Sequence, residues 1–93
     1  MNEFHLEIAA PDGMMYDGGA YMVSVRGIEG DLAILAGHIP LVTALAPGEV
    51  RVYPTAGADP KRGKCSGGCL TVSPRGVRLL AADFTWLTES ADK

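Results

Sequence analysis

Short segments in which apolar and polar residues alternate recur along the chain. Residues 4–8 are the clearest case, because Phe4, Leu6 and Ile8 alternate with His5 and Glu7. Alternation with a period of two indicates a strand that buries one face. Alternation or a short apolar run predicts five more strands, over residues 21–26, 49–53, 70–72, 77–82 and 84–87.

The longest mainly apolar stretch predicts two further strands, at about 31–35 and 41–46. Gly37-His38-Ile39-Pro40 interrupts this stretch. Pro40 inside a helix would remove a backbone hydrogen bond and clash with the preceding turn, so a helix is excluded. The interrupted run also falls short of the ~20 apolar residues that a membrane-spanning helix needs.

Glycine- and proline-rich turns separate these segments. They lie at residues 11–13, 17–19, 47–48, 66–68 and 74–76. About seven to nine short strands with a turn every ten residues or so are typical of an all-β sandwich or barrel. Residues 54–63, rich in glycine, proline and charge, read as an extended loop.

Composition limits the function further. The 93 residues suffice for one domain, and the net charge of −3 gives no support for nucleic-acid binding. The one basic cluster, Lys61-Arg62-Gly63-Lys64, is typical of a solvated loop or a protected edge strand. The N-terminus lacks the basic and apolar regions of a signal peptide, which predicts a cytoplasmic location.

Candidate catalytic chemistry is sparse. Ser66, His38 and Asp83 could in principle form a triad, but no Gly-x-Ser-x-Gly motif or phosphate-binding loop accompanies them. Cys65 and Cys69 read as two reduced thiols beside a turn, with no further metal ligands near them in sequence. We therefore expect no enzymatic activity, no cofactor and no metal, although a small hydrolase built around His38 is a third hypothesis.

Two polar residues have both a structural and a binding interpretation. Asp31 is either a turn residue before a strand or an acidic contact to a basic partner loop. His38 either hydrogen-bonds its own loop or lies at a loop tip that a partner contacts.

A long ordered set of residues resembles the epsilon subunit of F-type ATP synthases. The set begins with residues 4–8 and Pro11-Asp12-Gly13 and continues through Glu29-Gly30-Asp31, then residues 37–45 from Gly37-His38 to Ala44-Leu45. Ser66-Gly67-Gly68 and the apolar residues up to Ala81 extend the resemblance, which covers about residues 4–83.

This resemblance implies a flattened two-sheet β-sandwich of short, mostly antiparallel strands at the foot of the central stalk. It implies a non-catalytic rotor subunit that couples ion-driven rotation to ATP synthesis. The partners implied are the gamma subunit and the c-subunit ring, with the alpha and beta subunits in the same complex. The location implied is peripheral, without membrane insertion, on the cytoplasmic side of an energy-transducing membrane, the bacterial inner membrane.

Residues carried over from the family define two contact regions. Glu29, Gly30 and Asp31 match the loop that faces the c-subunit ring. The residues that match the part near gamma are His38, Pro40, Leu41, Val42 and Thr43.

The chain departs from the family pattern in two places. The helical hairpin that follows the sandwich in many members has no counterpart, which predicts a domain over residues 1–87, a polar tail over 88–93 and no nucleotide binding. Pro60 and the charges of residues 55–65 replace an apolar strand, leaving either a short edge strand or a loop. The alternative function is a free-standing β-sandwich module that binds a peptide or a carbohydrate.

Overall fold

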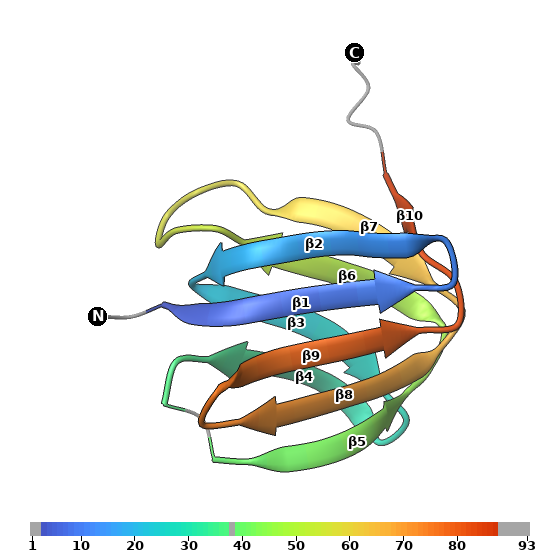
Figure 1. Cartoon of the computed structure of the whole chain (residues 1–93), viewed down its shortest axis with the longest axis horizontal. Coiled ribbons are helices and arrows are strands. Elements are labelled where there is room, and N and C mark those ends of the chain that lie inside the picture. Colours follow the sequence, from blue (N-terminus) through green and yellow to red (C-terminus); the bar gives the residue numbers. More distant parts are fainter. Residues whose placement is uncertain (1–2, 38, 88–93) are drawn as a thin grey trace.

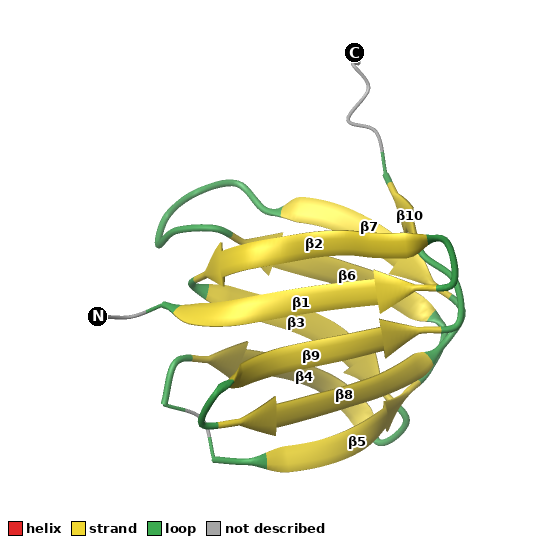
Figure 2. Cartoon of the chain, in the orientation of Figure 1, coloured by secondary structure: helices red, strands yellow, loops and turns green. Residues whose placement is uncertain are grey.

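The computed structural model describes residues 3–37 and 39–87, and this part of the chain contains ten strands and no helix (Figures 1 and 2). The all-β prediction is confirmed. The strands are β1 Phe4–Ala10, β2 Gly13–Ala20, β3 Met22–Gly27, β4 Gly30–Leu35, β5 Leu41–Leu45, β6 Gly48–Tyr53, β7 Lys61–Cys65, β8 Gly68–Ser73, β9 Gly76–Ala81 and β10 Thr85–Trp86. His38 and the predicted tail, 88–93, lie outside the described residues.

The strands form two layers of one curled sheet. Hydrogen bonds connect them in the order β10-β7-β6-β3-β5-β8-β9-β1-β2, with β4 paired to β3. In Figure 1, β2, β1, β9, β8 and β5 make the front layer, and β3, β4, β6 and β7 lie behind them. Of these pairings only β1 with β9 is parallel, so the predicted sandwich of mostly antiparallel strands is present.

The two layers are hydrogen-bonded to each other where β3 meets β5. Gly27 pairs with Leu45 there, and two backbone bonds flank the pair: Ile28 N to Ala44 O at 3.2 Å and Ala46 N to Arg26 O at 3.0 Å. The sheet therefore turns from one layer into the other without a free edge at this corner.

Alternating residues of both layers fill the core. Leu6 and Ile8 of β1 are completely buried, as the period-two pattern predicts. Val23 of β3 and Val52 of β6, in the opposite layer, belong to the same core and are also completely buried. The other members of the core are Ala20, Val25, Ile34, Leu45, Val50, Cys65, Leu70, Val72, Val77, Leu79, Ala81 and Phe84.

The predicted turn at residues 17–19 is wrong. Asp17 pairs with Glu7, Gly18 with Leu6 and Gly19 with His5, all within the β1–β2 ladder. Neither glycine has a positive φ, so both continue an extended strand. Pairing with β1 along the whole of β2 outweighs the local turn preference of Asp-Gly-Gly.

The charged segment before Cys65 is partly strand. Residues 54–60 form a loop, as expected, but Lys61–Cys65 pair with β6 on one side and with β10 on the other. Of the two alternatives, the short strand near the sheet edge is the observed one. Pro60 ends the loop immediately before this strand, where it disturbs no ladder hydrogen bond.

The last described strand, β10, pairs with β7 at one end of the sheet. The indole N–H of Trp86 donates to the Met15 carbonyl oxygen at 3.2 Å, and the rings of Phe84 and Trp86 meet edge to face at 4.8 Å between centroids. The ammonium nitrogen of Lys61, Nζ, lies 4.9 Å from the Trp86 ring centroid. Within residues 3–37 and 39–87, no helix is long and apolar enough to span a membrane.

Candidate functional site

The β3–β4 hairpin presents the first predicted contact region at its tip. Gly27 and Gly30 close the hairpin, so Ile28 and Glu29 form its two-residue turn. Ile28 is 62% exposed, and Gly30 has a φ of 132°, a value that an L side chain rarely adopts. Arg26 Nε lies 3.7 Å from Asp31 Oδ1 across the hairpin, with both side chains exposed.

The second predicted region lies on β5 and the residue before it. Val42 is 70% exposed, while Leu41 and Thr43 on either side are half-buried. Leu41 packs against the core, so Val42 and the exposed Pro40 are the members of this set that face outward. His38, the remaining member, is not among the described residues.

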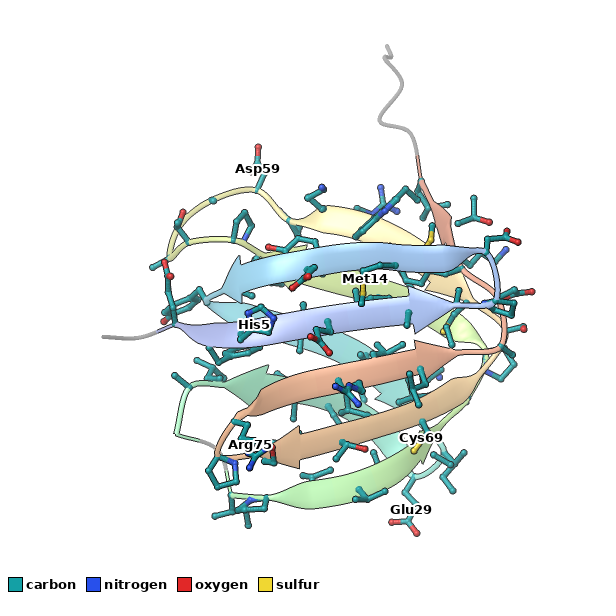
Figure 3. All side chains as sticks on the ribbon, viewed as in Figure 1. His5, Met14, Glu29, Asp59, Cys69 and Arg75 are labelled. Atoms are coloured by element: carbon teal, nitrogen blue, oxygen red, sulfur yellow. The ribbon has the colours of Figure 1, made fainter. Side chains whose placement is uncertain are left out.

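The two predicted regions adjoin at only one end of β5. The hairpin tip lies against this end, where Ile28 N bonds to Ala44 O, the residue after Thr43. Pro40 precedes the start of the same strand, four residues from Ala44 along extended backbone. Figure 3 shows Glu29 at the end of the molecule opposite Asp59 of the β6–β7 loop.

An apolar row crosses the outer face of the front layer beside Val42. Register places Ala44 opposite Cys69, Cys69 opposite Leu80, Leu80 beside Ala9, and Ala9 opposite Met14. We call Ala44, Cys69, Leu80, Ala9 and Met14 the apolar stripe. Leu80 is 50% exposed and Met14 is 54% exposed, so the stripe is open to solvent in this chain (Figure 3).

A charged cluster lies next to the stripe on the same face. His5 Nε2 is 2.8 Å from Asp17 Oδ1 and 3.5 Å from Glu7 Oε2. Arg78 Nε donates to the other oxygen of Glu7, Oε1, at 3.0 Å. Three strands, β1, β2 and β9, therefore contribute to one polar group of side chains.

The outer face of the opposite layer carries mainly charged residues. Glu49 of β6 accepts hydrogen bonds from Arg62 and, at 3.1 Å, from Arg51 Nε. The bond from Arg62, with the bond from Arg51, holds the pKa of Glu49 below its ordinary value. The bond to Glu49 in turn raises the pKa of Arg51. This layer presents charge where the front layer presents an apolar row.

Of the conceivable catalytic trio, His38 lies outside the described residues. Asp83 Oδ1 accepts a hydrogen bond from the Ser66 backbone N–H at 2.9 Å, so this carboxylate fixes the turn after β7. Cys65 is buried and Cys69 is half-buried, and both are free thiols.

The fold and its surfaces define a β-sandwich domain with an exposed apolar face, the arrangement of a protein that docks onto other chains. The chain belongs to the family of the ATP synthase Delta/Epsilon chain β-sandwich domain, whose model matches residues 3–87. The resemblance found in the sequence is thereby confirmed at the level of the family.

Several curated relatives are ATP synthase epsilon chains. The epsilon chain 1 of Nitrobacter hamburgensis is 36% identical over 89 residues, which cover 96% of this chain and 64% of the relative. The sodium ion specific epsilon chain of Acetobacterium woodii is 41% identical over 86 residues, covering 92% and 64%. This chain thus spans slightly less than two thirds of the length of these relatives.

Solved structures give the same result for the fold. A chain of the Euglena gracilis mitochondrial ATP synthase, in a structure of OSCP, F1 and the c-ring, superposes with a TM-score of 0.82 at 26% identity. The match covers 90% of this chain and 53% of that one. A chain of the Tetrahymena thermophila central stalk and c-ring structure, at 14% identity and a TM-score of 0.72, has the same fold.

Sequence reasoning missed the apolar stripe and the charged cluster. The outward positions of His5 and Glu7 follow from the period-two pattern of β1. Asp17 was assigned to a turn, and Arg78 joins the cluster only through the parallel pairing of β1 with β9. Neither the pairing of β1 with β2 nor that of β1 with β9 leaves a local signal in the sequence.

Proposed function

We propose that this chain is a non-catalytic subunit of the central stalk of an F-type ATP synthase. It binds the gamma subunit and the c-subunit ring, and it couples ion-driven rotation of the ring to ATP synthesis in the alpha and beta subunits. Family membership over residues 3–87 supports this role. The observation that carries it is the apolar outer face of the front layer, which nothing in the described part of the chain covers.

The gamma subunit is the partner that we assign to this face. Val42 in the middle of β5 is 70% exposed, and Leu80 and Met14 of the apolar stripe are about half exposed. Isolated exposed apolar residues are common, but a row that crosses five strands marks an interaction surface. Pro40 and Val42 contribute the outward side chains of the predicted gamma set, while Leu41 and Thr43 hold β5 in place from inside.

The c-subunit ring is the partner that we assign to the β3–β4 tip. Glu29 and Asp31 place two carboxylates at the tip, where Gly30 permits the tight backbone. Acidic side chains at an exposed tip set orientation and approach more than affinity. With the c-subunit ring at the β3–β4 tip and gamma along β5, one rigid domain contacts both partners.

Coupling requires a body that transmits torque with little deformation. The continuous ladder through β3 and β5 ties the two layers together, and the close-packed core resists compression. Catalysis is not part of the proposed role. The proposed location is peripheral, at the cytoplasmic side of the energy-transducing membrane.

The test is binding of this chain to the gamma subunit of the same organism. The two chains are co-expressed, purified through a tag on one of them, and titrated against each other by calorimetry. We expect a one-to-one complex, and we expect Val42→Asp to weaken it by at least about ten-fold, because a charge would be buried without a partner.

Ala33→Asp is the matched control. Ala33 is also an exposed strand residue, but it lies on β4 in the opposite layer. Circular dichroism confirms that both variants fold. If folded wild-type chain fails to bind gamma, the proposed function is wrong; if Ala33→Asp weakens binding as much as Val42→Asp, the assigned face is wrong.

A further inference from the structure

The charged cluster on the front layer has the composition of a metal-binding site. His5 and Glu7 are two residues apart on β1, so both side chains project from the same face. Asp17 lies directly opposite Glu7 on β2 and shares that face. One imidazole nitrogen and two carboxylates are thus contributed by adjacent strands rather than by a flexible loop.

The donor atoms are spaced as ligands of one ion are. His5 Nε2 is 2.8 Å from Asp17 Oδ1 and 3.5 Å from Glu7 Oε2, and all three donor atoms lie within 4.8 Å of one another. Ligands held roughly 2.0–2.2 Å from a tetrahedral zinc ion are roughly 3.3–3.6 Å apart, so His5 and Asp17 would have to separate slightly. An ion can therefore enter the group with small side-chain adjustments and no change of backbone.

Neighbouring residues support this geometry. Arg78 Nε bonds to Glu7 Oε1 and fixes the plane of the carboxylate, which leaves Oε2 directed at His5. Such bonds behind a ligand orient it and are part of metal sites in general. Counting Arg78, the group carries a formal charge of −1 when His5 is neutral, so a divalent cation is attracted rather than repelled.

Space remains on the open side of the group. A concavity of about 430 Å³, lined in part by His5, Glu7 and Arg78, adjoins it. The imidazole is half exposed, with 51% of the side chain accessible. A bound ion would keep at least one position for water or for a ligand from another molecule.

We propose that His5, Glu7 and Asp17 bind a divalent transition-metal cation, with zinc as the best match. Imidazole nitrogen and carboxylate oxygen together suit zinc, whereas calcium and magnesium favour oxygen donors alone. Binding through Nε2 requires its lone pair to face the metal, so the ring proton resides on Nδ1 in the metal-bound state. This site lies beside the apolar stripe, on the face that we assign to gamma, but the proposal does not rest on that assignment.

Calorimetric titration of the metal-free 93-residue chain with zinc chloride tests the proposal. We expect one zinc ion per chain and an affinity at least about ten-fold lower in His5→Gln and in Asp17→Asn. The nitrogen chemical shift of the His5 imidazole, followed by NMR during the titration, should show coordination through Nε2. Circular dichroism establishes that each variant is folded.

Three variants outside the cluster are the controls. Asp59→Asn removes an exposed carboxylate from the β6–β7 loop, and His38→Gln removes the other histidine. Cys69→Ser removes the half-buried thiol, which is a competing zinc ligand. All three should bind zinc as the unaltered chain does.

Three results would overturn the proposal. The first is a folded chain that takes up no zinc. The second is zinc binding that survives both cluster variants and disappears in Cys69→Ser or His38→Gln, because the ion would then be held elsewhere. The third is a similar weakening in Asp59→Asn, since it would show that general negative charge, not the cluster, attracts the ion.

Discussion

The backbone of Gly63 in β7 lies directly against the ring of Phe84. A Cβ atom at position 63 would overlap the edge of that ring, with the ring carbons Cζ, Cε1 and Cε2 all closer than van der Waals contact allows. Phe84 is 7% exposed and belongs to the core. Absence of a side chain at Gly63 is therefore what permits the segment before β10 to close over the end of the sandwich.

Gly63→Ala is accordingly expected to destabilise the chain by about 1–3 kcal/mol, the usual cost of overpacking a core. Urea unfolding followed by circular dichroism measures the change. Gly18→Ala is the control, because a Cβ atom there meets only ordinary contacts near 3.9 Å from the Tyr16 side chain. Equal stability of Gly63→Ala and the parent chain would show that Phe84 is free to move aside.

Loss of the Trp86 hydrogen bond should weaken the attachment of β10. Trp86→Phe keeps an aromatic ring near Phe84 and Lys61 but removes the indole N–H that donates to Met15 O. We expect a loss of about 1 kcal/mol from the hydrogen bond, measured by urea unfolding. Tyr21→Phe is a suitable comparison, because it also removes one polar group from a half-buried aromatic residue.

Most of the fold was predictable because most strands carry their signal locally. The alternation in β1 and the breaks at Pro40 and Gly76 mark elements without reference to the rest of the chain. The sequence pattern missed β2 and left β7 open between an edge strand and a loop, because these strands carry turn-forming or charged residues in their interiors. Their extended conformation comes from pairing, with β1 in one case and with β6 and β10 in the other.

The candidate site was predictable only in part for the same reason. The sequence pattern predicts a loop at Glu29–Asp31 and a strand at Val42; the structure has Glu29 in the β3–β4 turn, Asp31 already in β4, and Val42 on β5. The apolar stripe depends on the register of five strands, and the charged cluster on a parallel pairing between residues 7 and 78. A pattern within about ten residues of sequence contains no information on such pairings.

The ion pairs of Glu49 should make stability depend on pH in a defined window. Hydrogen bonding by Arg62 and Arg51 lowers the pKa of Glu49 from its ordinary value of 4.5. The ionised carboxylate is therefore more stable in the folded state than in the unfolded state. That stabilisation is present above pH 4.5 and is lost as the pH falls through the lowered pKa.

We thus expect Glu49→Gln to cost about 0.2–1 kcal/mol near neutral pH, a small value because the group is exposed to solvent. The difference from the parent chain should shrink as the pH falls from neutral to below 4.5. Urea unfolding of both chains across this range provides the measurement. A difference that stays constant down to the lowest pH would contradict the assignment of the effect to the carboxylate charge.

Charge at the β3–β4 tip should affect association with the c-subunit ring more than it affects folding. Glu29→Lys and Asp31→Lys each reverse an exposed charge, and Asp31 loses only a 3.7 Å pair with Arg26 inside the chain. Under the proposed function, each substitution is expected to weaken binding of the complex between this chain and gamma to isolated c-rings by about two- to ten-fold, and salt should reduce the difference. Asp59→Lys introduces the same charge at the far end of the molecule (Figure 3) and should leave binding unchanged. Equal weakening by all three would mean that total charge, and not the tip, controls the approach to the ring.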